Sequence, residues 1–117
     1  ALAGHRVTCL ARGETLAALQ GGLVLREGGH EERARVRALA DAAEAGPQEL
    51  LILASKATAL ADAARAALPL IGPHTLILPL QNGVPWWFLP GEPLRSVDPD
   101  GRIAASLPAQ QVVGAVV

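Results

Sequence analysis

Two polar side chains each follow a largely aliphatic run, at the point where a buried strand would end. Lys56 follows residues 50–55, and Asn82 follows residues 75–81. Continuous hydrophobic runs are typical of a parallel sheet that is buried on both faces, and such sheets bind ligands beyond the carboxyl ends of their strands. The pattern therefore predicts that Lys56 and Asn82 lie where the sheet presents its chemistry.

Lys56 has two interpretations. Its ammonium group could bind a carboxylate or a cofactor phosphate, or donate a hydrogen bond to a carbonyl oxygen. Alternatively, it is a lysine at the start of a helix that simply reaches into solvent. Cations are mildly unfavourable near a helix N-terminus, and this slightly favours a functional role.

Asn82 and Gly83 form a dipeptide that is common in turns, and a turn is the simplest interpretation. The flanking residues do not form two alternating strands, however, so a hairpin fits poorly. A side-chain amide at a strand end can donate to a substrate oxygen and accept from a neighbour. Gly83 would then allow the backbone to approach a ligand closely.

Arg12 follows a predicted strand at residues 6–11, and no Asp or Glu stands at that strand end. In a dinucleotide-binding sheet, an acidic residue near the adenosine ribose binds the hydroxyls of NAD, whereas an arginine accommodates the 2′-phosphate of NADP. A guanidinium group can pair with a phosphate through two parallel hydrogen bonds. The alternative is an ordinary exposed arginine, and a single residue does not separate the two.

The only aromatic residues are consecutive: Trp86, Trp87 and Phe88. Three large rings in a row cannot all face one core, so we expect at least one to lie exposed, against a ligand or against another domain. Packing under the following Pro- and Gly-rich loop, residues 89–100, explains the run equally well.

Composition argues against several classes of protein. A chain of 117 residues is one domain at most, and one that is 50% hydrophobic and 18% charged is not expected to be disordered. Its net charge of −1 offers no basic surface for nucleic acid and no polybasic membrane signal. Pro, Gly or a charge interrupts every apolar run before it reaches the length of a membrane span.

Metal and disulfide chemistry are not expected either. The three histidines are scattered without metal-ligand spacing, and Cys9 is the only cysteine, which fits a reducing compartment. The sequence contains neither a Walker A motif nor the nucleotide-binding glycine pattern G-x-G-x-x-G.

Strand-like and helix-like segments alternate along the chain. We predict strands at 6–11, 50–55, 75–81 and 111–117, helical segments at 14–20, 40–45, 57–68 and 101–107, and a hairpin from 23–26 and 34–38 around a polar turn. This order predicts an α/β fold with a mostly parallel sheet and helices on both faces. The alternating Arg33, Arg35 and Arg37 are expected to share one solvated face.

In their order and spacing, these segments resemble the N-terminal domain of the ketopantoate reductases (2-dehydropantoate 2-reductases). The resemblance is carried by residues 4–13, 55–57, 80–88, 96–99 and 112–117, and it covers nearly the whole chain. It implies a Rossmann-like domain that binds NADPH, with a helical C-terminal domain completing the substrate site.

The resemblance also implies roles for individual residues. Arg12 would contact the 2′-phosphate of NADP, and Lys56 and Asn82 would line the cleft near the nicotinamide and the substrate. Gly83, next to Asn82, is also expected to contact the cofactor. Hydride would pass to the ketone of a 2-keto acid such as ketopantoate, in pantothenate biosynthesis in the cytoplasm. The resemblance assigns no role to the aromatic run.

Two parts of the family pattern are not found in the chain. The first strand with its glycine-rich turn precedes the matching residues in the family, and the helical domain follows them. We therefore expect residues 1–117 to be a partial Rossmann-like domain that is inactive alone, with apolar sheet edges exposed. The alternative is a non-catalytic module that forms homo-oligomers or binds a protein partner through the open edge and the aromatic run.

Overall fold

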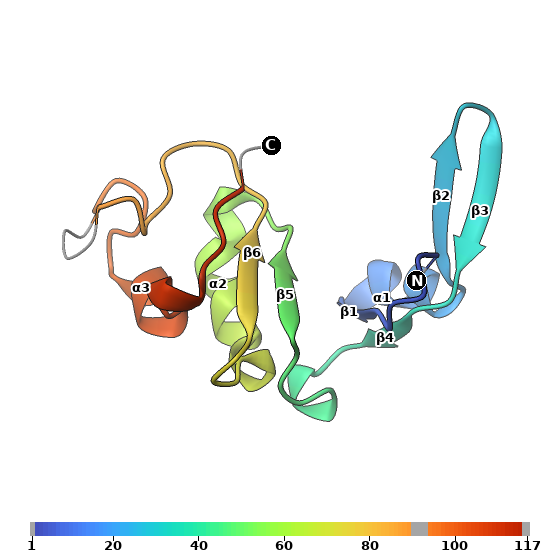
Figure 1. The fold of residues 1–117 in the computed structure, drawn as a ribbon, viewed down its shortest axis with the longest axis horizontal. Helices are drawn as coiled ribbons and strands as arrows, with labels where there is room; N and C mark the ends of the chain where they lie inside the picture. Colours follow the sequence, from blue (N-terminus) through green and yellow to red (C-terminus); the bar gives the residue numbers. More distant parts are fainter. Residues whose placement is uncertain (1, 90–93, 116–117) are drawn as a thin grey trace. The chain divides into compact units, whose positions relative to one another are not determined.

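The structure is a computed structural model that describes residues 2–89 and 94–115 (Figure 1). The chain divides into two compact units, Ala1–Ala45 and Gly46–Val117. Among the described residues, each sheet has two strands: β1 with β4, β2 with β3, and β5 with β6. Short helices accompany these pairs, so the predicted α/β class is confirmed.

The first unit contains a parallel pair and one helix. Strand β1 is Thr8–Leu10, helix α1 is Gly13–Gln20, and strand β4 is Arg37–Leu39. The pairing is continued beyond β1 by the amide of Arg37, which donates to the carbonyl of Val7 at 2.9 Å. The predicted strand and helix at this end of the chain are confirmed.

A hairpin projects from the same unit. Strands β2, Leu23–Glu27, and β3, His30–Ala34, are antiparallel and joined by Gly28 and Gly29. Both glycines have positive φ, 55° and 82°, which tight two-residue hairpin turns favour. The predicted second strand at 34–38 is therefore wrong, because this turn pairs Glu27 with His30 and starts the returning strand four residues earlier.

Charged side chains cover the hairpin. Glu31 accepts hydrogen bonds from Arg26 at 2.8 Å and from Arg33 at 3.2 Å. The bond from Arg26, and after it the interaction with Arg33, lowers the pKa of the Glu31 carboxyl. All three groups are exposed, so water screens the pairs and they contribute little to stability. Arg33, Arg35 and Arg37 are all exposed, as expected, but they do not belong to one strand, because β3 ends at Ala34 and Arg37 belongs to β4.

The second unit is built on a parallel pair of strands that lie side by side in Figure 1. Strand β5, Leu50–Leu53, pairs along its length with β6, Leu76–Pro79. On β6 itself, the carbonyl of Ile77 accepts a hydrogen bond from the amide of Val113 at 2.8 Å. The predicted closing strand at 111–117 is thus reduced to one parallel bridge, and its residues 116–117 lie outside the described residues.

Short helices occur in both units. They are η1 (Ala42–Glu44) in the first unit and η2 (Ala57–Ala59), α2 (Leu60–Ala66), η3 (Leu68–Leu70), α3 (Arg102–Ser106) and η4 (Ala109–Gln111) in the second. Helix α2 contacts β5, and α3 contacts α2. Among the described residues, no helix is long and apolar enough to cross a membrane.

The sheet of the second unit is buried on one face. Leu51 and Leu53 are in the core, whereas Leu50 and Ile52 are 49% and 51% exposed. For the residues the structure describes, the expected burial on both faces is wrong, because α2 lies against one side of β5 and the opposite apolar side faces solvent.

Asp98 is a buried carboxylate that starts α3. It accepts hydrogen bonds from the amides of Ile103 at 3.1 Å and Ala104 at 2.9 Å. These amides belong to the first turn of the helix, which has no intrahelical acceptor for them. The Asp98 side chain thereby fixes the residue at which the preceding loop ends and α3 begins.

Hydrogen bonds also determine where β6 begins. Thr75 is only 2% exposed; its hydroxyl donates to the carbonyl of Gln48 at 2.6 Å and accepts from the amide of Gly72 at 2.8 Å. The Gln111 side chain donates to the carbonyls of Gly72 at 2.7 Å and Thr75 at 2.9 Å. Two loops and η4 therefore meet at the amino end of β6.

We predict that Thr75→Val lowers the free energy of unfolding by about 1–3 kcal/mol, because valine has nearly the same shape but leaves the Gly72 amide and the Gln48 carbonyl without this partner. Urea unfolding of the 117-residue chain, followed by tryptophan fluorescence, measures the loss. The exposed Thr58→Val is the matched control and should change stability by less than about 0.5 kcal/mol. Equal losses in the two variants would contradict the assigned role.

Candidate functional site

The ends of β5 and β6 bring the two predicted site residues to the same edge. The strands are parallel, with Leu53 opposite Pro79, so both chains leave the sheet in the same direction. The amide of Leu80 donates to the carbonyl of Leu53 at 3.0 Å and is the last main-chain bond of this ladder. Lys56 and Asn82 follow within three residues of these strand ends. The structure therefore confirms their placement at neighbouring strand ends.

Lys56 is the only lysine in the sequence. It precedes η2 with extended backbone angles, φ −61° and ψ 150°, and its carbonyl accepts from the amide of Ala59 at 2.9 Å. The side chain is exposed and has no hydrogen-bond or ion-pair partner among the described residues. An ammonium group in this position is available to an anionic or carbonyl ligand.

Asn82 is exposed, and its amide also lacks a partner within the described part of the chain. The next residue, Gly83, has φ +101°, and a Cβ added there would meet no atom within 4 Å. Glycine is therefore favoured at this position by the positive φ of the backbone, and not because a side chain would lack space. A free amide beside this backbone can both donate to and accept from a ligand.

Gln81 connects the two strand ends, although no sequence motif marked it as a site residue. Its side-chain amide is half-buried and donates to the main-chain carbonyl of Ser55 at 3.3 Å. Ser55 directly precedes Lys56, and Gln81 directly precedes Asn82. A polar residue that ends an aliphatic run was the only sequence signal for this contact.

Arg12 belongs to the first unit and is described within it. It lies between β1 and α1, with extended angles of φ −134° and ψ 161°, and its side chain is exposed. No ion pair of Arg12 is found among the described residues. The first amides of α1 follow directly, and helix N-termini favour anions. An unpaired guanidinium group beside them fits a phosphate.

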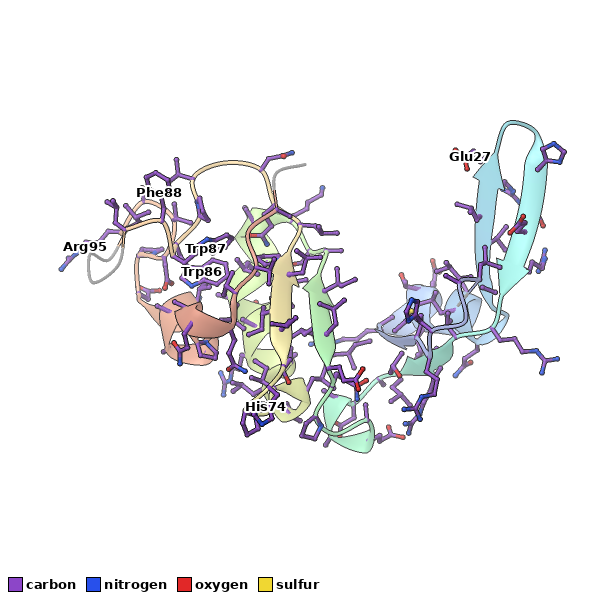
Figure 2. All side chains as sticks on the ribbon, in the orientation of Figure 1. Glu27, His74, Trp86, Trp87, Phe88 and Arg95 are labelled. Carbon is purple, nitrogen blue, oxygen red and sulfur yellow. The ribbon has the colours of Figure 1, made fainter. Side chains whose placement is uncertain are left out.

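The aromatic run divides between core and surface, as Figure 2 shows. Trp86 is buried and meets Trp87 edge to face, with ring centroids 4.4 Å apart. Phe88 is 64% exposed. The expectation that at least one ring lies exposed is confirmed, and the burial of Trp86 shows that part of the run does pack into the core. The indole nitrogen of Trp86 has no hydrogen-bond partner among the described residues.

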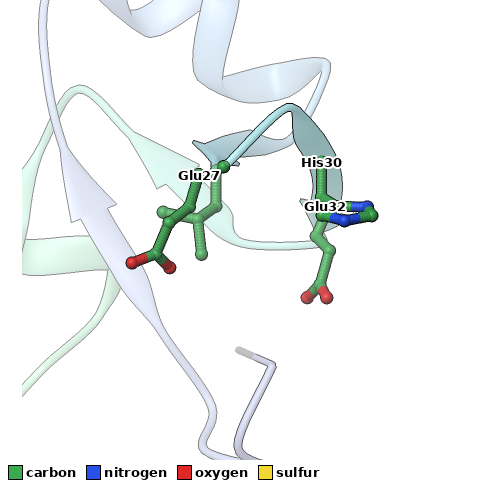
Figure 3. A pocket seen from close by; sticks show the side chains of 5 residues that line it. Glu27, His30 and Glu32 are labelled. Carbon is green, nitrogen blue, oxygen red and sulfur yellow. The ribbon is translucent and has the colours of Figure 1, made fainter.

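A separate hollow of about 380 Å³ lies on the hairpin (Figure 3). Glu27, His30 and Glu32 line it together with Leu25 and Gly28. Within residues 2–89 and 94–115, no group of three or more His, Cys, Asp or Glu side chains could hold a metal ion. Two glutamates and one histidine of the hairpin thus form the polar part of its lining.

Comparisons with known proteins agree with the arrangement of the strands. The family model described as "Ketopantoate reductase PanE/ApbA" matches residues 1–117. A protein of Mesorhizobium japonicum named 2-dehydropantoate 2-reductase is 44% identical, in an alignment that covers 100% of this chain and 39% of the relative.

Solved structures give the same result. The crystal structure of a candidate ketopantoate reductase from Ralstonia solanacearum MolK2 matches with a TM-score of 0.95 and 48% identity over 100% of this chain and 39% of that one. A PanE/ApbA family ketopantoate reductase from Ralstonia eutropha JMP134 matches with a TM-score of 0.69 and 26% identity over 99% of this chain and 34% of that one. The chain thus spans about two fifths of the length of its closely matching relatives. It belongs to the ketopantoate reductase PanE/ApbA family and corresponds to the N-terminal domain of its members.

Proposed function

We propose that this chain is the NADP-binding part of an oxidoreductase that reduces a 2-keto acid, of the ketopantoate type, to the corresponding alcohol. The observation that carries the proposal is the pairing of β5 with β6, which sets the unpartnered side chains of Lys56 and Asn82 at neighbouring strand ends. The names of the relatives support the same reaction.

Each unit carries residues whose chemistry suits one part of the proposed cofactor. Arg12 offers an exposed guanidinium group without an ion-pair partner in the described chain, suited to a 2′-phosphate. Gly83, with positive φ and open space around it, leaves room beside the backbone for a ring. When bound, NADPH supplies the hydride for the reduction.

The chain's own residues would bind and orient the reactants. The Lys56 ammonium group binds an anionic group of substrate or cofactor, or donates a hydrogen bond to the ketone oxygen. The Asn82 amide donates to a substrate oxygen and accepts from its neighbour. The hydrogen-bonded strand ends hold the backbone near both residues, so the freedom lost on binding a ligand is mainly that of the two exposed side chains.

For the longer protein we propose a cytoplasmic enzyme with a Rossmann-like, mostly parallel sheet carrying helices on both faces. The two parallel pairs seen here support such a sheet. The apolar face at Leu50 and Ile52 supports the presence of additional covering structure, since exposed apolar surface of this kind usually contacts other polypeptide.

Substitutions at the strand ends test the proposed reaction. In the full-length protein, Lys56→Ala and Asn82→Ala should each lower kcat/KM for ketopantoate and NADPH by about tenfold or more, because each removes a group that orients a reactant. The loss of NADPH absorbance measures the rate. Arg65→Ala, which removes an exposed cation from α2, is the control and should retain activity. Wild-type rates in both strand-end variants would refute the assigned roles.

A second substitution tests cofactor choice. Arg12→Ala should raise KM for NADPH by roughly tenfold or more while changing KM for NADH little, because only NADPH carries the 2′-phosphate. Steady-state kinetics with both cofactors measure the difference. Arg35→Ala removes another exposed arginine of the same unit and should leave the preference for NADPH intact. A proportional loss with both cofactors would argue against a phosphate contact.

The second candidate is a non-catalytic module that self-associates or binds a protein partner. The exposed Phe88, Val84 and Ile52 favour it, because they leave apolar surface in water. It predicts that the 117-residue chain forms a stable oligomer whose tryptophan fluorescence does not respond to NADPH. A monomer whose fluorescence titrates with NADPH would instead support the enzyme. Light scattering and a fluorescence titration distinguish the two.

A further inference from the structure

We propose that Gln81 is a positioning residue that holds the ends of β5 and β6 together and thereby sets the separation of Lys56 and Asn82. The inference rests on the proposed function for the roles of those two side chains. The connection between the strand ends does not depend on the proposed function, because it is a hydrogen bond of the structure, from the Gln81 side chain to the Ser55 carbonyl.

The bond continues the sheet after its backbone ladder has ended. The Leu80 amide donates to the Leu53 carbonyl, and beyond it no main-chain hydrogen bond joins these two segments among the described residues. The next connection is made by a side chain: the Gln81 amide reaches the Ser55 carbonyl at 3.3 Å, across 26 residues of sequence. Without it, each chain would leave the sheet independently.

The location of the bond gives it a specific consequence. Its acceptor residue is one position before Lys56, and its donor residue is one position before Asn82. Gln81 and Ser55 are half-buried, whereas Lys56 and Asn82 are exposed. The hydrogen bond is therefore partly shielded from water, and this makes it stronger than it would be in full contact with solvent. The side chains next to it remain free for a ligand.

The structure also offers a comparison that separates positioning from simple stabilisation. Gln111 makes the same kind of bond, from a side-chain amide to main-chain carbonyls, at the amino end of β6. Ligands of parallel sheets bind at the carboxyl ends of the strands. Removing the Gln111 bonds should therefore cost stability without moving the predicted site.

The experiment compares four variants of the full-length protein. Gln81→Met keeps the length of the side chain and removes the donor, and Gln81→His restores an N–H at a similar reach. Gln111→Met is the matched control at the opposite end of the strand. Ser55→Ala keeps the accepting carbonyl, and it removes a hydroxyl that is buried without a partner among the described residues.

Two readouts are used. Hydrogen–deuterium exchange of peptides that cover residues 53–57 and 80–84 should become at least about threefold faster in Gln81→Met, and stay unchanged in the other three variants. The value of kcat/KM with NADPH and ketopantoate should fall by about tenfold or more in Gln81→Met, since small displacements of positioned groups are costly. It should recover substantially in Gln81→His and remain within twofold in Gln111→Met and Ser55→Ala.

Each contrary result has one meaning. Unchanged exchange in Gln81→Met would overturn the connection itself. Faster exchange without a loss of kcat/KM, or an equal loss in Gln111→Met, would overturn the positioning role. If the wild-type protein does not oxidise NADPH with 2-keto acids, the proposed function fails, while exchange, which does not depend on turnover, still decides whether Gln81 connects the strand ends.

Discussion

The parallel pairing of β5 with β6 is the constraint on which the second unit and its candidate site depend. Four residue pairs, from Leu50 with Leu76 to Leu53 with Pro79, define the register. Because parallel strands end at the same edge, residues 26 positions apart in sequence become neighbours there. A shift of the register by one residue would separate the strand ends and move the alternating side chains to the opposite faces.

Packing on one face of this pair supplies the stability that the register needs. Ile77 is fully buried at the middle of β6, and Leu51 and Leu53 of β5 are buried with it. Burial of aliphatic side chains of this size contributes about 1.5–3 kcal/mol each. The alternating residues of β5 point to the other face and remain exposed, so this unit is stabilised from one side within the residues the structure describes.

Side-chain amides act at both ends of β6, with different consequences. Gln111 and the Thr75 hydroxyl bind loop carbonyls at the amino end, where they determine the start of the strand. Gln81 binds a loop carbonyl at the carboxyl end, beside the two candidate site residues. The same chemical contact therefore serves the fold at one end and the geometry of the site at the other.

Local sequence determined the α/β class, most strands and helices, and the placement of Lys56 and Asn82 after strand ends, because aliphatic runs and helix periods are local signals. It misplaced the second hairpin strand: Gly28-Gly29 is itself a turn signal, but the polar residues that follow it lack the hydrophobic pattern of a strand and form one only by pairing with β2. Only the tertiary structure decided that one face of β5 stays exposed, that Trp86 is buried while Phe88 is not, and that Gln81 reaches Ser55. These features depend on contacts between residues distant in sequence, which no local pattern encodes.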